Sequence, residues 1–216
     1  MLSGTILGRM ITSSRLAAIC LLLSSVTTKA VEKPFHWQWR KMDDSFWQRP
    51  ILRQMKVKND DRVAIIDAVA SSLKKDDGGL RDLGDADLYD LASNESYEWA
   101  DLDGDGAPEL ITMTFGADTC GAVGNCILQV FRRHGTKLEL VLITGAQYLM
   151  VDRSGTKPLL VLYTHESATE GDLAVYSFPR RSNATFEYHY NVSWAPLDGS
   201  GSAYSQPHLD TLPLTR

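Results

Sequence analysis

The chain has 216 residues and carries 22 basic and 27 acidic side chains, which give a formal net charge of −5. A chain of this length favours one domain with a substantial core of its own. An acidic surface repels nucleic-acid backbones and anionic membranes, so the charge disfavours both as partners.

The first thirty residues have the pattern of a secretory signal peptide. Arg9 and Arg15 supply positive charge, and an apolar run follows from Leu16 to Val26. That run is short for a membrane span, which takes about 20 apolar residues. Small residues at Thr28 and Ala30 suit a signal peptidase, so we expect cleavage after Ala30. A retained membrane anchor is the alternative.

Cleavage changes both the compartment and the charge. It removes three basic residues and no acidic one, which lowers the net charge from −5 to −8. We expect an exported protein, periplasmic or extracellular, with no integral membrane span in the mature chain. The mature chain should form one α+β domain over residues 31–194, with a helical and aromatic part (31–94) and a β-meander (95–194). Residues 195–216 are rich in Pro, Gly and Ser and predict a weakly ordered tail.

The helical part begins with an aromatic segment, residues 31–50. Its rings are expected to dock onto the core, since each buries a large area with few rotatable bonds; a ligand-binding arm is the alternative. Two helices are then predicted, one from Asn59 to Lys75 and a short one over Asp85–Ala92. The aromatic residues are Phe35, Trp37, Trp39, Phe46 and Trp47, and the apolar positions of the first helix are Val63, Ile66, Val69, Ala70 and Leu73.

From Ser96 onward the apolar residues recur with period two, and turn-forming residues separate the runs. Short strands at this spacing, without helical runs between them, predict an antiparallel meander of seven or eight strands with the helices packed on it. The most apolar run, Pro158–Tyr163, should be covered on both faces, one of them by the first helix. The predicted strands are Tyr97–Ala100, Glu109–Phe115, Ile127–Arg133, Leu138–Thr144, Tyr148–Val151, Leu159–Tyr163, Leu173–Phe178 and Thr185–Val192.

The mature chain keeps two cysteines, Cys120 and Cys126. An oxidising compartment favours a disulfide between them, and the two glycines among the five intervening residues allow so small a ring to close. A redox-active pair is normally spaced Cys-x-x-Cys, and a zinc site needs more ligands nearby. We therefore predict a structural disulfide.

The motif with the clearest chemistry is Asp101-Leu-Asp-Gly-Asp-Gly-Ala-Pro-Glu109. Its three aspartates stand at positions 1, 3 and 5, and a glycine at position 6 permits the sharp turn that brings carboxylates around one centre. Calcium prefers six to eight hard oxygen ligands, and clustered carboxylates without a cation repel one another. We predict a structural Ca²⁺ held by Asp101, Asp103, Asp105, the carbonyl of Ala107, and Glu109.

This loop resembles the strand-flanked calcium loops of FG-GAP/VCBS-type propeller proteins. It departs from an EF-hand, because position 12 is Thr112 and the following residues are β-branched. The FG-GAP tripeptide order is absent, and one copy of the loop cannot make a propeller. The resemblance implies that a carboxylate at position 9 completes the metal's ligands.

A longer stretch resembles a group of uncharacterised exported bacterial proteins. It comprises the acidic motif, Cys120-Gly-x-x-Gly-x-Cys126, and Val130-Phe-Arg132. In that group the second cysteine commonly follows Gly-Gly directly, whereas Asn125 intervenes here. The resemblance implies a calcium-bound hairpin beside a disulfide loop, and no activity.

No catalytic motif is complete, so we lean against an enzyme. The favoured hypothesis is a calcium-stabilised binding or interaction module for a protein or glycan partner. One alternative is an inhibitor or immunity-type protein that inserts the disulfide loop, Gly121–Asn125, into a partner. Another is an enzyme whose site lies near His165 and Glu166, where Glu170 and Asp172 add two carboxylates on what we predict to be a loop.

Overall fold

The structure, a computed structural model, describes residues 44–56, 58–75, 80–117, 119–167, 170–193 and 208–211. All of these residues belong to one compact unit of the chain. The predicted signal peptide and most of the aromatic segment lie outside the described residues, so both remain predictions.

Two α-helices precede the strands, α1 (Asn59–Leu73) and α2 (Asp85–Ser93). Short 3-10 helices stand before each of them: η2 (Asp44–Gln48), η3 (Leu52–Gln54) and η4 (Leu80–Asp82). Acidic residues occupy the first turn of both α-helices, where they interact favourably with the helix dipole. The boundaries agree with the two helices that the apolar spacing predicts.

The buried face of α1 differs in part from the prediction, since Ala70 is only half-buried and Ser72 is buried. Ile66, Val69 and Leu73 are buried as expected, at the i, i+3, i+7 spacing of one helical face. Val63 was expected beside them but is 38 % exposed, and Ile65 is buried instead. The reason is that the buried residues of α1 lie on the side of the helix that carries Ile65 and Val69. Val63 lies beyond the edge of this face and is therefore turned toward solvent.

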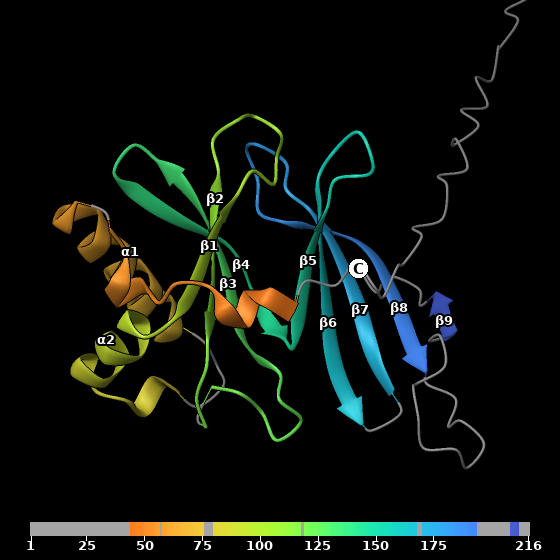
Figure 1. Cartoon of the computed structure of the whole chain (residues 1–216), viewed down its shortest axis with the longest axis horizontal. Helices are drawn as coiled ribbons and strands as arrows, with labels where there is room; N and C mark the ends of the chain where they lie inside the picture. The colour runs from red at the N-terminus through yellow and green to blue at the C-terminus, as the bar shows by residue number, and fades with distance from the viewer. Residues whose placement is uncertain are drawn as a thin grey trace, which may run out of the picture. The chain divides into compact units, whose positions relative to one another are not determined.

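The strands form two antiparallel sheets (Figure 1). The first sheet has the order β1-β2-β3-β4 and the second the order β5-β6-β7-β8-β9, so in both sheets neighbours in sequence are neighbours in space. The bounds are β1 Ser96–Ala100, β2 Glu109–Thr114, β3 Cys126–His134, β4 Lys137–Ala146, β5 Tyr148–Asp152, β6 Leu159–Ser167, β7 Glu170–Ser177, β8 Thr185–Ser193 and β9 His208–Thr211.

The predicted strands are all present, with ends that agree within four residues. Two features were not expected. The meander breaks into two sheets at the single residue Gln147, between β4 and β5. Residues 208–211, inside the predicted tail, form β9 and pair with β8. The rest of 195–216 lies outside the described residues.

One core lies between the two sheets. It joins Ile111, Met113 and Val130 of the first sheet to Leu160 and Leu162 of the second. A second core lies on the opposite face of the first sheet, where Leu110 and Phe131 pack against residues of α1 and α2. The first sheet is therefore covered on both faces, and every residue of β2 is buried.

This arrangement corrects one expectation about the helices. The sequence predicted the first helix as a cover for the apolar run Pro158–Tyr163, which becomes β6. The buried residues of α1 pack instead on the first sheet, whereas Leu160 and Leu162 of β6 pack in the core between the sheets. An apolar run shows that a strand needs covering, but it does not show which element covers it.

A buried carboxyl group lies under the helices, at the start of β1. Glu95 is fully buried, its backbone carbonyl accepts a hydrogen bond from Leu52 N at 2.9 Å, and Thr114 Oγ1 donates to its Oε1. Next to it along β2, Thr112 Oγ1 donates to Gln129 Oε1 at 3.1 Å. Burial raises the pKa of Glu95 from 4.5 to about 8, so its carboxyl is protonated at neutral pH.

Glu95 should therefore make the folded state less stable as the pH rises. The folded protein retains this proton up to about pH 8, whereas the unfolded chain loses it near 4.5. Its contribution is complete below 4.5 and disappears as the pH passes through the folded pKa. We expect Glu95→Gln to remove this loss, a difference of a few kcal/mol between acidic and alkaline pH.

Chemical denaturation across the pH range measures this difference, with Asp67→Asn as an exposed carboxyl control on α1. The free energies of unfolding of wild type and Glu95→Gln should diverge as the pH rises. Parallel curves for the two proteins would show that Glu95 does not hold a proton in the folded state.

Candidate metal centre and the pocket beside it

The acidic motif forms the connection between β1 and β2. Ala100 pairs with Glu109, so the intervening eight residues make the loop of a hairpin. Gly104 and Gly106 have φ angles of 74° and 88°, a conformation that glycine adopts without strain. The turn predicted at Gly106 is therefore present, and Gly104 shares its backbone conformation.

Backbone amides of the loop donate to its own aspartates. Asp101 accepts hydrogen bonds from Gly104 N at 2.7 Å and from Gly106 N at 3.1 Å, one on each carboxylate oxygen. Asp103 accepts from Asp105 N at 3.0 Å, and Asp105 accepts from Ala107 N at 2.7 Å. These local bonds hold the aspartates in the folded loop.

Three of the four predicted carboxylates converge. Single oxygens of Asp101, Asp103 and Glu109 all lie within 4.8 Å of one another, a spacing that suits a shared cation. The Asp105 side chain is exposed and is not part of this group, and Ala107 is exposed beside it. The structure thus brings positions 1, 3 and 9 together and leaves positions 5 and 7 at the rim of the loop.

A buried arginine faces the same carboxylates. Arg132 on β3 places its Nε 3.5 Å from Glu109 Oε1 and 4.0 Å from Asp103 Oδ2. Its side chain is 8 % exposed, and among the described residues its Nε and Nη2 make no hydrogen bond. Burial raises the pKa of Glu109 and of Asp103, and the charge of Arg132 opposes that rise. The guanidinium therefore compensates part of the negative charge at this centre.

Two further arginines link the loop to the second sheet. Arg153, after β5, donates to the carbonyl of Asp101 at 3.2 Å, and Arg180, after β7, donates to the carbonyl of Gly104 at 3.3 Å. Arg132 itself donates to the carbonyl of Ser182 at 3.0 Å, which joins β3 to the β7–β8 connection. The acidic loop is thus held at one end of the two sheets by three guanidinium groups.

A pocket of about 420 Å³ opens beside the loop. Its apolar lining includes Leu102 and Phe178, which are almost fully buried. Its remaining walls come from the acidic loop, the β5–β6 connection and the end of β7, and comprise Asp103, Lys157, Pro158, Ser177, Pro179 and Arg180.

The predicted disulfide is present between Cys120 and Cys126, with a Cα–Cα distance of 3.9 Å. The loop that it closes is also tied to β6: Asn125 Nδ2 donates to the carbonyl of His165, and His165 N donates to Asn125 Oδ1, both at 2.8 Å. Val123 at its tip is 39 % exposed. The disulfide loop therefore crosses from the first sheet to the second.

The structure brings part of the alternative enzyme site together and separates His165 from it. His165 lies on β6, where its Nδ1 is 3.3 Å from Val123 O. Glu166 shares a hydrogen bond with Asp172, which raises the pKa of Glu166, and His189 Nε2 lies 3.4 Å from Asp172 Oδ2. His165 thus contacts the disulfide loop, while His189 on β8 joins the carboxylates. These residues lie on strands and not on the loop that the sequence predicts.

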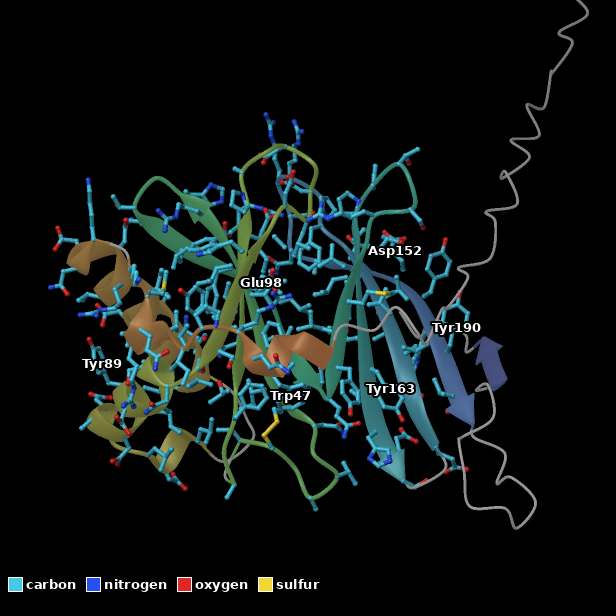
Figure 2. All side chains as sticks on the ribbon, viewed as in Figure 1. Trp47, Tyr89, Glu98, Asp152, Tyr163 and Tyr190 are labelled. Atoms are coloured by element: carbon cyan, nitrogen blue, oxygen red, sulfur yellow. A yellow bond between two sulfur atoms is a disulfide. The ribbon has the colours of Figure 1, made fainter. Side chains whose placement is uncertain are left out.

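Aromatic rings line the same region as the disulfide loop. Trp47 of η2 packs on Phe115 at a centroid distance of 4.2 Å and approaches Tyr148 at 6.4 Å, and Tyr148 stacks on Tyr163 at 6.2 Å. Figure 2 shows Trp47 near the disulfide and Tyr163 farther along, on β6, with Asp152 toward the other end of β5. The described end of the aromatic segment is thus docked on the fold, as its composition predicts.

Comparison with family models, with curated proteins and with solved structures found no match. None of the helices in the described ranges is both long enough and apolar enough to cross a membrane. The site must therefore be interpreted from its own geometry.

Sequence reasoning missed the arginines of this site. Arg132, Arg153 and Arg180 lie between 31 and 79 residues from Asp101 along the chain. Strand pairing brings Arg132 near the loop, and the packing of the second sheet on the first brings Arg153 and Arg180 there. One signal was available, since Arg132 interrupts the alternating apolar pattern of a central strand. A charge at such a position indicates a buried partner.

Arg132→Gln should destabilise the protein strongly, because it leaves Glu109 and Asp103 buried without their cation. We expect a loss of about 3–5 kcal/mol in the free energy of unfolding when chelator is present. The neighbouring Arg133→Gln removes an exposed ion pair with Asp61 and a cation–π contact with Trp99, each worth about 1 kcal/mol or less. Urea denaturation of both variants measures the difference, and equal losses would contradict the role given to Arg132.

Proposed function

We propose that this chain is an exported binding module whose acidic loop holds a calcium ion. The observation that carries the proposal is the convergence of Asp101, Asp103 and Glu109 on a loop between two strands. All three offer carboxylate oxygen and none offers nitrogen or sulfur, a donor set that suits Ca²⁺ better than zinc or copper. The carbonyl of Ala107 and the carboxylate of Asp105 would complete the ligands.

The charge at the site supports a divalent cation. The four carboxylates of the loop, with the two guanidinium groups whose charges act on Asp103, those of Arg132 and Arg180, retain a formal charge of −2. Arg153 and Arg180 donate to carbonyls of the loop and not to its carboxylates. Calcium would therefore relieve a repulsion that Arg132 and Arg180 only partly offset.

The role proposed for the ion is structural. It would fasten the β1–β2 connection at the point where the loop also contacts the second sheet through Arg153 and Arg180. An ion that binds only the folded state stabilises it by mass action. Export supplies the setting, since extracellular modules work at calcium dissociation constants of about 10⁻⁴–10⁻³ M.

Calcium should raise the melting temperature. With about 10 mM Ca²⁺ in place of EDTA, we expect about 1–3 kcal/mol of stabilisation, or an increase of about 3–10 °C in the melting temperature. Differential scanning calorimetry measures the shift. Asp103→Asn should lose it, because it removes one charged ligand, whereas Asp67→Asn on α1 should keep it. Identical melts of the wild type in the two conditions would refute the calcium site.

Export has its own test. In a bacterial host that secretes the full chain, the mature protein should begin at Val31, and a bulky residue in Ala30→Phe should block processing. Mass spectrometry of the periplasmic fraction reads the cleavage site, with Val31→Ile as the control beside it. An uncleaved wild-type chain in the membrane fraction would support the membrane-anchor alternative instead.

A further inference from the structure

We infer that the pocket beside the acidic loop binds a small carboxylate that carries an apolar body, such as an aromatic or branched aliphatic group. The inference gives the proposed binding module a ligand class, and it does not require the calcium ion. It rests on the volume of the pocket, on its apolar lining, and on the charges at its rim.

The size and lining suit a small organic ligand. Ligand pockets have volumes of about 300–1,000 Å³ and combine apolar walls with a few polar groups, and this one measures about 420 Å³. Leu102 and Phe178 form a fixed base but are only 1 % and 4 % exposed, so the apolar surface that a ligand can reach comes mainly from other lining residues, among them Pro158 and Pro179. An apolar group of about the size of a phenylalanine side chain fits this space.

The charges at the rim favour an anion. Lys157 and Arg180 both line the pocket and are exposed, so each can approach a ligand without losing a buried partner. Within the described part of the chain, Lys157 makes no ion pair, and the hydrogen bond of Arg180 goes to the uncharged carbonyl of Gly104. The charge of Arg180 also acts on Asp103, where it opposes the rise in pKa that burial causes. The bond to Gly104 holds the guanidinium at the rim and leaves other N–H donors for a carboxylate.

The remaining polar groups limit the charge of the ligand. Asp103 is the acidic residue of the lining, and its carboxylate faces Arg132 at 4.0 Å. Ser177 donates its hydroxyl to Glu187, so it is already paired. A dianion such as phosphate would be repelled by Asp103 and would leave the apolar walls unfilled. A monocarboxylate with an apolar body satisfies both the cations and the walls.

The test compares N-acetyl-L-phenylalanine with N-acetyl-L-phenylalanine amide, which has the same apolar body and no charge. Titration of the full chain, followed by protein NMR, should show that the acid binds and shifts amides around Leu102 and Phe178. The amide should bind at least about ten-fold more weakly, since it lacks the charge-assisted bonds. A short blocked peptide ending in phenylalanine distinguishes the sources: tighter binding assigns the pocket to peptide C-termini, and equal binding to free acids.

Arg180→Gln and Lys157→Gln should each weaken binding of the acid, by about ten-fold for the arginine, whereas Arg181→Gln next to it should not. Arg180→Gln also removes the hydrogen bond to Gly104 and can disturb the loop. Lys157→Gln leaves that bond intact, so it tests the role of the positive charge by itself. No binding of the acid, equal binding of acid and amide, or equal effects of Arg180→Gln and Arg181→Gln would overturn the inference. Binding of the acid without a calcium-dependent melting shift would support the pocket and reject the metal site. A calcium-dependent melting shift without binding of the acid would support the metal site and reject the pocket.

Discussion

The contact on which this end of the fold depends is the buried guanidinium of Arg132 against Glu109 and Asp103. Glu109 is the first residue of β2, the strand that is buried on both faces, so its carboxylate has little access to water. A charge in that position needs a cation nearby. Arg132 on β3 supplies that cation. The same side chain donates a hydrogen bond to the carbonyl of Ser182 and so links the first sheet to the second. Charge compensation and sheet-to-sheet contact thus use one side chain.

The two sheets are joined by polar contacts at both ends of their shared core. At one end Arg153 and Arg180 donate to carbonyls of the acidic loop, and at the other Asn125 exchanges two hydrogen bonds with the backbone of His165. Apolar packing between sheets is non-directional and allows them to slide. Directional hydrogen bonds at the two ends set their relative position, and the pocket and the disulfide loop form where these bonds are made.

The sequence predicts local features well and distant contacts poorly. Apolar residues with period two, together with turn residues, locate the strands, because successive side chains of a strand point to opposite faces of the sheet. The division at Gln147 was not predictable from the sequence. A one-residue connection has the same sequence pattern whether the next strand pairs with the previous one or starts a new sheet. The acidic loop was recognisable because its carboxylates lie close together in the sequence. Its arginines were not, because only the packing of the second sheet against the first brings Arg153 and Arg180 to it.

Asp103 belongs both to the carboxylate group of the loop and to the wall of the pocket. A cation bound by the loop would neutralise the carboxylate that repels an anion in the pocket, so the two ligands should assist each other. Thermodynamic linkage requires that the cation raise the affinity for the anion by the same factor as the anion raises the affinity for the cation. Arg132 limits the size of this coupling, because it already offsets part of the charge of Asp103. The two proposed sites would therefore be coupled through one carboxylate, and the strength of the coupling would depend on how much of the charge of Asp103 Arg132 leaves uncompensated.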